Sequence, residues 1–152
     1  MFINKFATAI ALVLATIPQM GLADLLIERN WLSSGQDWYL MEDKVRQVEP
    51  NIFMALHYLT LNRPQDSLEI FNDDFEVVGV QKIGTYRSYQ YLSFFDCKKQ
   101  LVADYGTRYF SAVRPSKEHL VYKEIPDSDR LYYSLPRNQK LLNRVCSIGR
   151  AK

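Results

Sequence analysis

Polar and apolar residues alternate along several stretches of this chain, which is typical of strands with one buried face. The clearest stretch is 52–61, where both parities carry apolar side chains, so we expect a strand covered on both faces. The same pattern predicts strands at 38–41, 75–83 and 86–97. Because side chains alternate along a strand, one face of the last stretch carries Tyr89, Tyr91, Ser93, Phe95 and Cys97.

Turn-forming residues separate these stretches. Asn62–Asp66 predicts a loop, and Gly84-Thr85 predicts a turn. Tyr105-Gly106 predicts the tip of a hairpin made by 100–105 and 107–113.

The remaining segments of the strand-rich part are less regular. Residues 24–35 fit either a short helix or an arm. The segment 114–130 contains prolines and is rich in charge, so we expect a long connection. A short strand is expected at 131–133.

The hydrophobic period changes near the C-terminus. Pro136 suits the first turn of a helix, and Gly149 stands where a helix would end. We therefore expect an amphipathic helix over 136–148, with an apolar face made by Leu141, Leu142, Val145 and Cys146. The predicted fold class is α+β, a small antiparallel sheet of about six strands with this C-terminal helix packed on it.

Residues 1–23 are typical of a secretory signal peptide. Lys5 supplies the positive start, 6–17 is apolar, and 21–23 supplies small residues for cleavage. The apolar run is shorter than a bilayer span requires, although an uncleaved anchor is the alternative. We expect a mature single domain at 24–152, exported to the periplasm or cell surface, with neither a lipid anchor nor a transmembrane segment after cleavage.

Export sets the expected state of the two cysteines. Cys97 and Cys146 would meet in an oxidising compartment, where a pair usually forms a disulfide. A metal site or a reactive thiol is the weaker interpretation, because the chain has no CxxC motif and no histidine near either cysteine. We expect the bond to join the strand that ends at Cys97 to the C-terminal helix.

Composition and motifs mainly exclude classes of function. The chain has 152 residues, is 47% hydrophobic and carries a formal net charge of +2, which fits one domain and gives no electrostatic case for nucleic acid. Motifs for a nucleophile elbow, a zinc protease or a phosphate loop are missing from the sequence. His57 lies in an apolar strand and His119 in the charged connection, so we expect structural and solvated histidines rather than a zinc site.

No metal, no cofactor and no enzymatic activity are therefore expected. A Ser–His–Asp set stays open, because its members meet only in space.

Aromatic content is the unusual feature, with ten tyrosines and eight phenylalanines. One explanation is cross-strand packing. The other is an exposed recognition surface, because tyrosine is enriched at interface hot spots. Our candidate partner-binding residues, for acidic protein surfaces or glycans, are Lys82, Arg87, Tyr89 and Tyr91.

Several features occur together in a familiar order: YQYLSFFDC at 89–97, a turn at Tyr105-Gly106, a proline-initiated helix, and LLNRVC at 141–146. Over about 37–148 the chain resembles the surface-adhesin protein E family of Gram-negative bacteria. The resemblance implies a small antiparallel sheet with a disulfide-tied C-terminal helix. It also implies an exported non-catalytic binding protein for host extracellular-matrix or serum proteins, with the binding region at about 82–95.

This chain departs from the founding member of that family in lacking a lipidation cysteine. The alternative function is a periplasmic structural or envelope-assembly component with a bacterial protein partner. A homodimer is compatible with either function.

Overall fold

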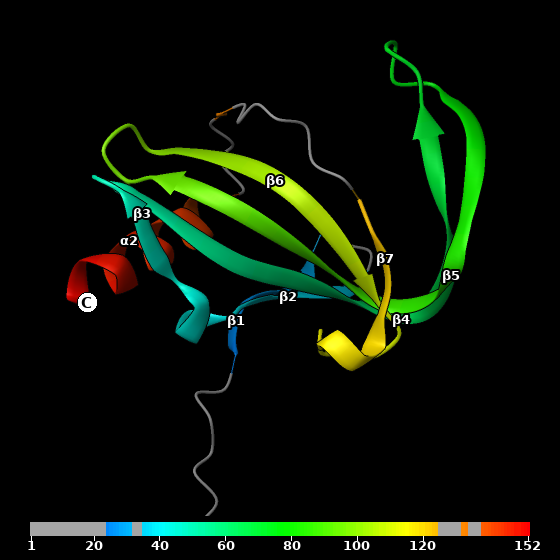
Figure 1. Ribbon diagram of the computed structural model, residues 1–152, viewed down its shortest axis with the longest axis horizontal. Coiled ribbons are helices and arrows are strands. Elements are labelled where there is room, and N and C mark those ends of the chain that lie inside the picture. The colour runs from blue at the N-terminus through cyan, green and yellow to red at the C-terminus, as the bar shows by residue number, and fades with distance from the viewer. Residues whose placement is uncertain (1–23, 32–34, 125–131, 134–137) are drawn as a thin grey trace, which may run out of the picture.

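Two twenty-residue strands, β4 (Ile52–Phe71) and β5 (Val77–Asp96), pair with each other at the centre of the sheet. Figure 1 shows them in the computed structural model, which describes residues 24–31, 35–124, 132–133 and 138–152. The other elements are β1 (Leu25–Trp31), β2 (Gln36–Leu40), β3 (Arg46–Glu49), β6 (Leu101–Phe110), β7 (Leu120–Lys123) and the helix α2 (Gln139–Ala151). Short 3-10 helices lie at Glu42–Lys44 and Lys117–His119.

The strands form one antiparallel sheet in the order β1-β2-β4-β5-β6-β7. β3 also pairs with β4, next to β2 along the same edge. The predicted α+β class is confirmed, with seven strands where about six were expected.

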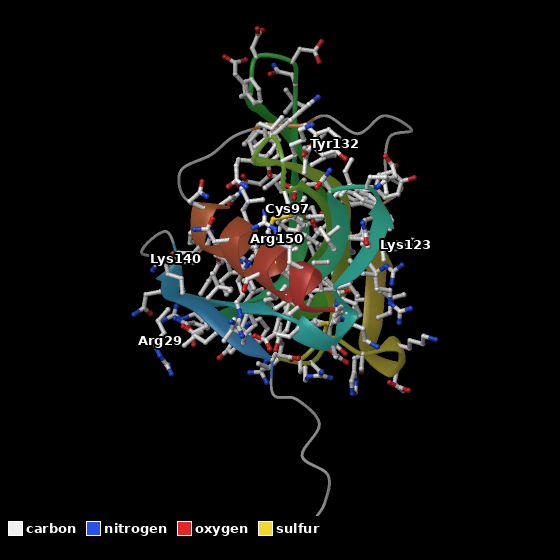
Figure 2. All side chains as sticks on the ribbon, turned by 90° about the vertical axis from the view of Figure 1, so that its left-hand side faces the viewer. Arg29, Cys97, Lys123, Tyr132, Lys140 and Arg150 are labelled. Carbon is white, nitrogen blue, oxygen red and sulfur yellow. A yellow bond between two sulfur atoms is a disulfide. The ribbon has the colours of Figure 1, made fainter. Side chains whose placement is uncertain are left out.

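One face of the sheet is buried under α2. The helix contributes Leu141, Leu142, Val145 and Cys146 to a cluster with Phe53, Ala55, Leu59 and Phe95 of the two long strands. Complete burial of one such aliphatic side chain stabilises a fold by about 1.5–3 kcal/mol. Figure 2 shows the helix, in orange and red, lying over the sheet with the disulfide at Cys97 beside it.

The three turns predicted inside the strand region are wrong. Residues 62–66 lie within β4, Gly84-Thr85 within β5 and Tyr105-Gly106 within β6. Irregular pairing accompanies them: the register shifts between Thr60 and Gln65, and Tyr105 has no partner on β5. Turn residues here produce bulges that bend a strand, and the chain reverses instead at 72–76 and 97–100.

Other expected boundaries also change. Residues 25–31 form a strand, so neither a helix nor an arm is present there. The expected long connection contains β7, and Tyr133 makes an isolated bridge to Val102. Pro136 and the signal peptide at 1–23 lie outside the described residues.

The predicted C-cap at Gly149 is wrong, because α2 continues to Ala151. Gly149 has a different role: a Cβ atom there would lie 2.4 Å from Cε1 of Phe53. Only glycine lets the last turns of the helix approach this ring so closely.

The Cys97–Cys146 disulfide is confirmed, with a Cα–Cα distance of 5.7 Å. It joins α2 to the residue that follows β5. A cross-link over a sequence separation of 49 residues removes much of the unfolded chain's freedom.

We expect the double variant Cys97→Ser/Cys146→Ser to lose about 4 kcal/mol of unfolding free energy, because the unfolded chain regains its loop entropy. Thermal unfolding should show a melting temperature lower by roughly ten degrees or more. Ser147→Ala, an exposed neighbour on α2, is the control and should melt like the parent. An unchanged melting temperature in the double variant, or free thiols in the native protein by mass spectrometry, would contradict this account.

Candidate functional site

The four predicted partner-binding residues occupy different environments. Tyr89 and Tyr91 lie half-buried on the helix-facing side of β5, with ring centroids 5.7 Å apart. Arg87 is exposed. Lys82 is also exposed and pairs with Ser67 in the outer part of the β4–β5 ladder. The structure therefore brings the two tyrosines together and places Lys82 on a separate part of the strand.

The two tyrosines belong to a pocket of about 170 Å³ beside the start of α2. We call it the aromatic pocket, and its main walls are Trp31, Trp38, Tyr89, Tyr91, Asp104 and Tyr133. Five strands contribute to it, together with Tyr133, Asn138 and Leu141, so it exists only in the folded sheet.

A chain of hydrogen bonds forms the floor of this pocket. Trp38 Nε1 donates to His57 Nδ1 at 3.0 Å, and His57 Nε2 lies 2.8 Å from Ser93 Oγ. Ser93 Oγ donates to Asp104 Oδ1 at 2.6 Å. The Tyr133 hydroxyl donates to the other carboxylate oxygen of Asp104 at 2.5 Å.

The direction of this chain follows from its first member. Indole nitrogen is only a donor, so His57 Nδ1 must accept and Nε2 must carry the hydrogen. His57 then donates a hydrogen bond to Ser93, and the Ser93 hydroxyl donates one to Asp104. In a hydrolytic triad, by contrast, histidine takes the serine proton and the carboxylate holds the histidine. The order here is different, because the lone pair of the imidazole is already used by Trp38.

Burial controls the charge of these groups. His57 is 5% exposed, and desolvation lowers its pKa from 6.5 to about 4, against an opposing effect of the Asp104 charge. The imidazole is therefore neutral at pH 7. Desolvation also raises the pKa of the Tyr91 hydroxyl.

Sequence reasoning missed the pocket, although strand parity contained part of the signal. His57 shares its face of β4 with Ala55 and Leu59, and the register places it opposite Tyr91. The contributions of Trp31, Asp104 and Tyr133 depend on strand order, which alternation does not give.

A second candidate surface lies where β4 and β5 run beyond the rest of the sheet. We call residues 62–83, the outer parts of both strands and their turn, the arm. Figure 1 shows it in green, bending away from the sheet to a free tip. At the tip, Asn72 Oδ1 accepts hydrogen bonds from the backbone N–H groups of Asp74 and Glu76.

Exposed apolar side chains concentrate on the arm. Of the exposed large hydrophobic residues in the described ranges, six lie on the arm: Ile70, Phe71, Phe75, Val77, Val78 and Val80. Single exposed apolar residues are ordinary, whereas these six lie close together in sequence on one two-stranded ribbon. Phe71 and Val80 also line an open groove of about 790 Å³ at the base of the arm.

Phe75 is the most prominent of these residues. Its side chain is 87% exposed and its φ is +60°, a conformation uncommon for an aromatic residue. Its own N–H donates to the Asn72 carbonyl, so the turn holds it in place. Strained, fixed residues of this kind gather at sites of recognition.

The arm is acidic as well as apolar. It carries two basic residues, Arg63 and Lys82, against five acidic ones: Asp66, Glu69, Asp73, Asp74 and Glu76. The prediction of an ordinary sheet strand at 75–83 missed this surface. Acidic residues placed before and within the apolar run are the signal that the run is not covered.

These features define a class of protein: a small antiparallel sheet with one disulfide-linked helix, an aromatic pocket and a projecting hairpin. No helix in the described ranges has the length and apolar character that a membrane crossing requires. Two of three comparisons gave no match, since neither a family model nor a curated protein resembles the chain.

Solved structures of Haemophilus influenzae protein E are similar to this chain. The structure from a non-typeable strain has 15% identity and a TM-score of 0.47, covering 72% of this chain and 69% of that one. The selenomethionine form has 13% identity and a TM-score of 0.48, covering 77% and 81%. Identity this low does not establish membership, so the family named from the sequence stays a resemblance.

We expect the stability of the protein to depend on pH through His57. The unfolded state, with a histidine pKa of 6.5, binds more protons than the folded state down to about pH 4. Stability is therefore complete above about pH 6.5 and falls as the pH drops toward 4, by up to about 3 kcal/mol. Urea unfolding at a series of pH values measures this slope.

The variant His57→Gln should flatten the curve, because glutamine can still accept from Trp38 but does not titrate. His119→Gln, at an exposed histidine, should keep the parent curve. Parallel curves for the parent and His57→Gln would refute the assignment.

Proposed function

We propose that this chain is an exported, non-catalytic protein-binding module that engages its partner with the arm. The observation that carries the proposal is the group of exposed apolar side chains from Ile70 to Val80 on a ribbon of only two strands. Removing apolar surface from water contributes roughly 25 cal/mol per Å². These side chains stay exposed to water in the folded chain, so a partner that covers them gains this free energy on binding.

The aromatic and acidic residues at the tip of the arm indicate what kind of surface its partner presents. Phe75 is an aromatic anchor whose backbone is held by the tip turn, so little backbone freedom is lost on binding. Carboxylates of Asp73, Asp74 and Glu76 surround it in sequence. A complementary surface is an apolar pocket with a basic rim, since opposite charges speed association and exclude wrong partners.

The resemblance noted from the sequence supports the finer form of this function. It implies an adhesive protein that binds host extracellular-matrix or serum proteins through about 82–95. Lys82 and Arg87 of that stretch are exposed, and Lys82 lies on the arm. Partner contact at the arm would extend onto this part of β5.

A second function is favoured by the apolar and acidic character of the arm. The adhesin hypothesis anticipates an aromatic and basic patch, whereas an envelope-assembly component is expected to carry an exposed apolar surface for a bacterial partner. In either case the binding element is the arm, and the source of the partner distinguishes the two functions.

The test is a capture experiment with tagged mature protein and two pools, periplasmic extract and immobilised matrix and serum proteins. The variant Phe75→Ser/Val78→Thr/Val80→Thr removes apolar contact and keeps residues that suit strands. We expect capture of the specific partner to fall at least about tenfold, as at other aromatic hot spots. Circular dichroism and the melting temperature should not change, because these side chains pack on no core.

Two control variants sharpen the result. Val113→Thr removes an exposed apolar residue outside the arm and should leave capture unchanged. Lys82→Ala/Arg87→Ala tests the basic residues predicted from the sequence. Full capture by the arm variant would contradict the proposal, and loss only in the lysine–arginine variant would move the interface from the tip of the arm to residues 82–87 of β5.

A further inference from the structure

We propose that the arm binds an extended segment of its partner protein as an added β-strand, and that this segment alternates apolar and basic side chains. The strand is added along 77–83 of β5, on the side away from β4, which we call the β5 edge. This inference rests on the proposed function and deepens it, because it assigns the backbone of the arm, besides its side chains, to partner binding.

The inner and outer parts of β5 differ in their neighbours. From Ser88 inward, β5 pairs with β4 on one side and with β6 on the other. Over 77–83, β4 is the only strand of the described ranges that pairs with it. A Cβ atom at Gly84 would lie 2.8 Å from Cγ1 of Val121 in β7, so the open stretch ends there. Figure 1 shows the arm standing away from the other strands.

The β5 edge presents a row of backbone hydrogen-bonding groups. In an antiparallel ladder, about every second residue directs its N–H and C=O groups to the strand on a given side. On the open side of 77–83, the described part of the chain supplies no strand and no other backbone hydrogen bond. An extended chain satisfies such a row, and it would continue outward the position that β6 occupies further in.

The two edges of the arm are not equivalent. Proteins protect an exposed edge with proline and with charged side chains. On the β4 side, 63–71 carries a proline and three charged residues, all of them exposed: Arg63, Pro64, Asp66 and Glu69. On the β5 side, 77–83 has no proline, and Lys82 is its only charged residue. Because one edge is protected and the other is not, the β5 edge is the one that accepts a strand.

The side chains of the β5 edge favour an apolar neighbour. Val78 and Val80 share one face of the strand and are 61% and 62% exposed, and Val77 lies on the other face at 52%. An added strand covers part of both faces, and β-branched side chains suit such cross-strand contact. A third strand also stabilises a two-stranded ribbon, which is marginal by itself.

Charge favours a basic segment over a second copy of this chain. Two basic and five acidic residues give the arm a net charge of −3. Two copies paired through their β5 edges would place two such arms side by side, where like charges repel. A basic strand is attracted instead. This strand and the basic-rimmed pocket proposed for Phe75 then belong to one partner surface.

The probe is a synthetic peptide, acetyl-Lys-Val-Arg-Val-Thr-Val-Lys-amide, which carries strand-forming residues and three positive charges. Nuclear magnetic resonance of isotope-labelled mature protein follows its titration. We expect saturable shifts of the amides of 77–83, together with slower hydrogen exchange at alternate residues, because alternate N–H groups face the new strand. Amides on the outer side of β4 at 63–69 should keep their exchange rates.

Two control peptides separate backbone pairing from charge. The first has the same side chains and N-methylated central amides, so it lacks the backbone donors. Loss of several hydrogen bonds should weaken its binding at least about tenfold. The second has glutamate in place of lysine and arginine, and repulsion by the acidic arm should weaken its binding about fivefold or more.

A matched pair of variants locates the peptide. Lys82→Glu reverses a charge on the β5 edge, and Arg63→Glu makes the same change at an exposed residue of the β4 edge. Lys82→Glu should tighten binding of the basic peptide about threefold, because the reversed charge lies on the adjacent strand. Arg63→Glu should change it less at physiological salt, because the β4 edge lies one strand further away.

Equal affinity for the N-methylated peptide would overturn the inference, because the arm would then bind through side chains alone and its protein-binding function would stand. No saturable shift over 77–83 would also overturn it. A dimer that forms with concentration and slows exchange at 77–83 without peptide would assign the β5 edge to a second copy. Failure of the proposed function is a separate result, namely full partner capture by Phe75→Ser/Val78→Thr/Val80→Thr.

Discussion

Pairing between β4 and β5 is the interaction on which the other elements depend. From Ile52–Asp96 to Thr60–Ser88 the register is unbroken, and this inner half supplies the floor of the core. Beyond Thr60 the register shifts, the strands bend, and the same ladder continues as the arm. One pairing thus produces both a buried sheet centre and an exposed ribbon, and the irregular step between them separates the two.

Two further contacts fix what lies over the inner half. The disulfide holds α2 at the end of β5, and the missing side chain at Gly149 lets the helix approach Phe53. Beside the start of the helix, the core is polar rather than apolar, with His57 and Ser93 linked from Trp38 to Asp104. A fully satisfied buried network rigidifies its surroundings, while loss of one member leaves the others unpaired at a cost. This side of the sheet therefore has a rigid polar core beside the start of the helix.

Sequence patterns predicted the features that depend on local periodicity. Alternation placed Tyr89, Tyr91 and Cys97 on one face of a strand, and the helical period placed Cys146 on the buried side of the last helix. The expectation of an oxidising compartment then predicted the disulfide between the two cysteines. The same patterns failed at 62–66, Gly84 and Tyr105, because turn residues also serve bulges, and only the pairing partner decides between a reversal and a bend. The pocket and the arm were missed for a related reason: strand order determines which rings converge and which apolar strands remain uncovered.

The central claim is that the arm serves binding and contributes little to the fold. Replacing 67–82 by Asn-Gly, a pair suited to a two-residue hairpin turn, shortens the ladder close to the end of the sheet. The direct measurement is the melting temperature of this shortened protein together with its capture of the specific partner. The account predicts a melting temperature within a few degrees of the parent and loss of capture. Retained capture, or a shortened protein that no longer folds, would contradict it.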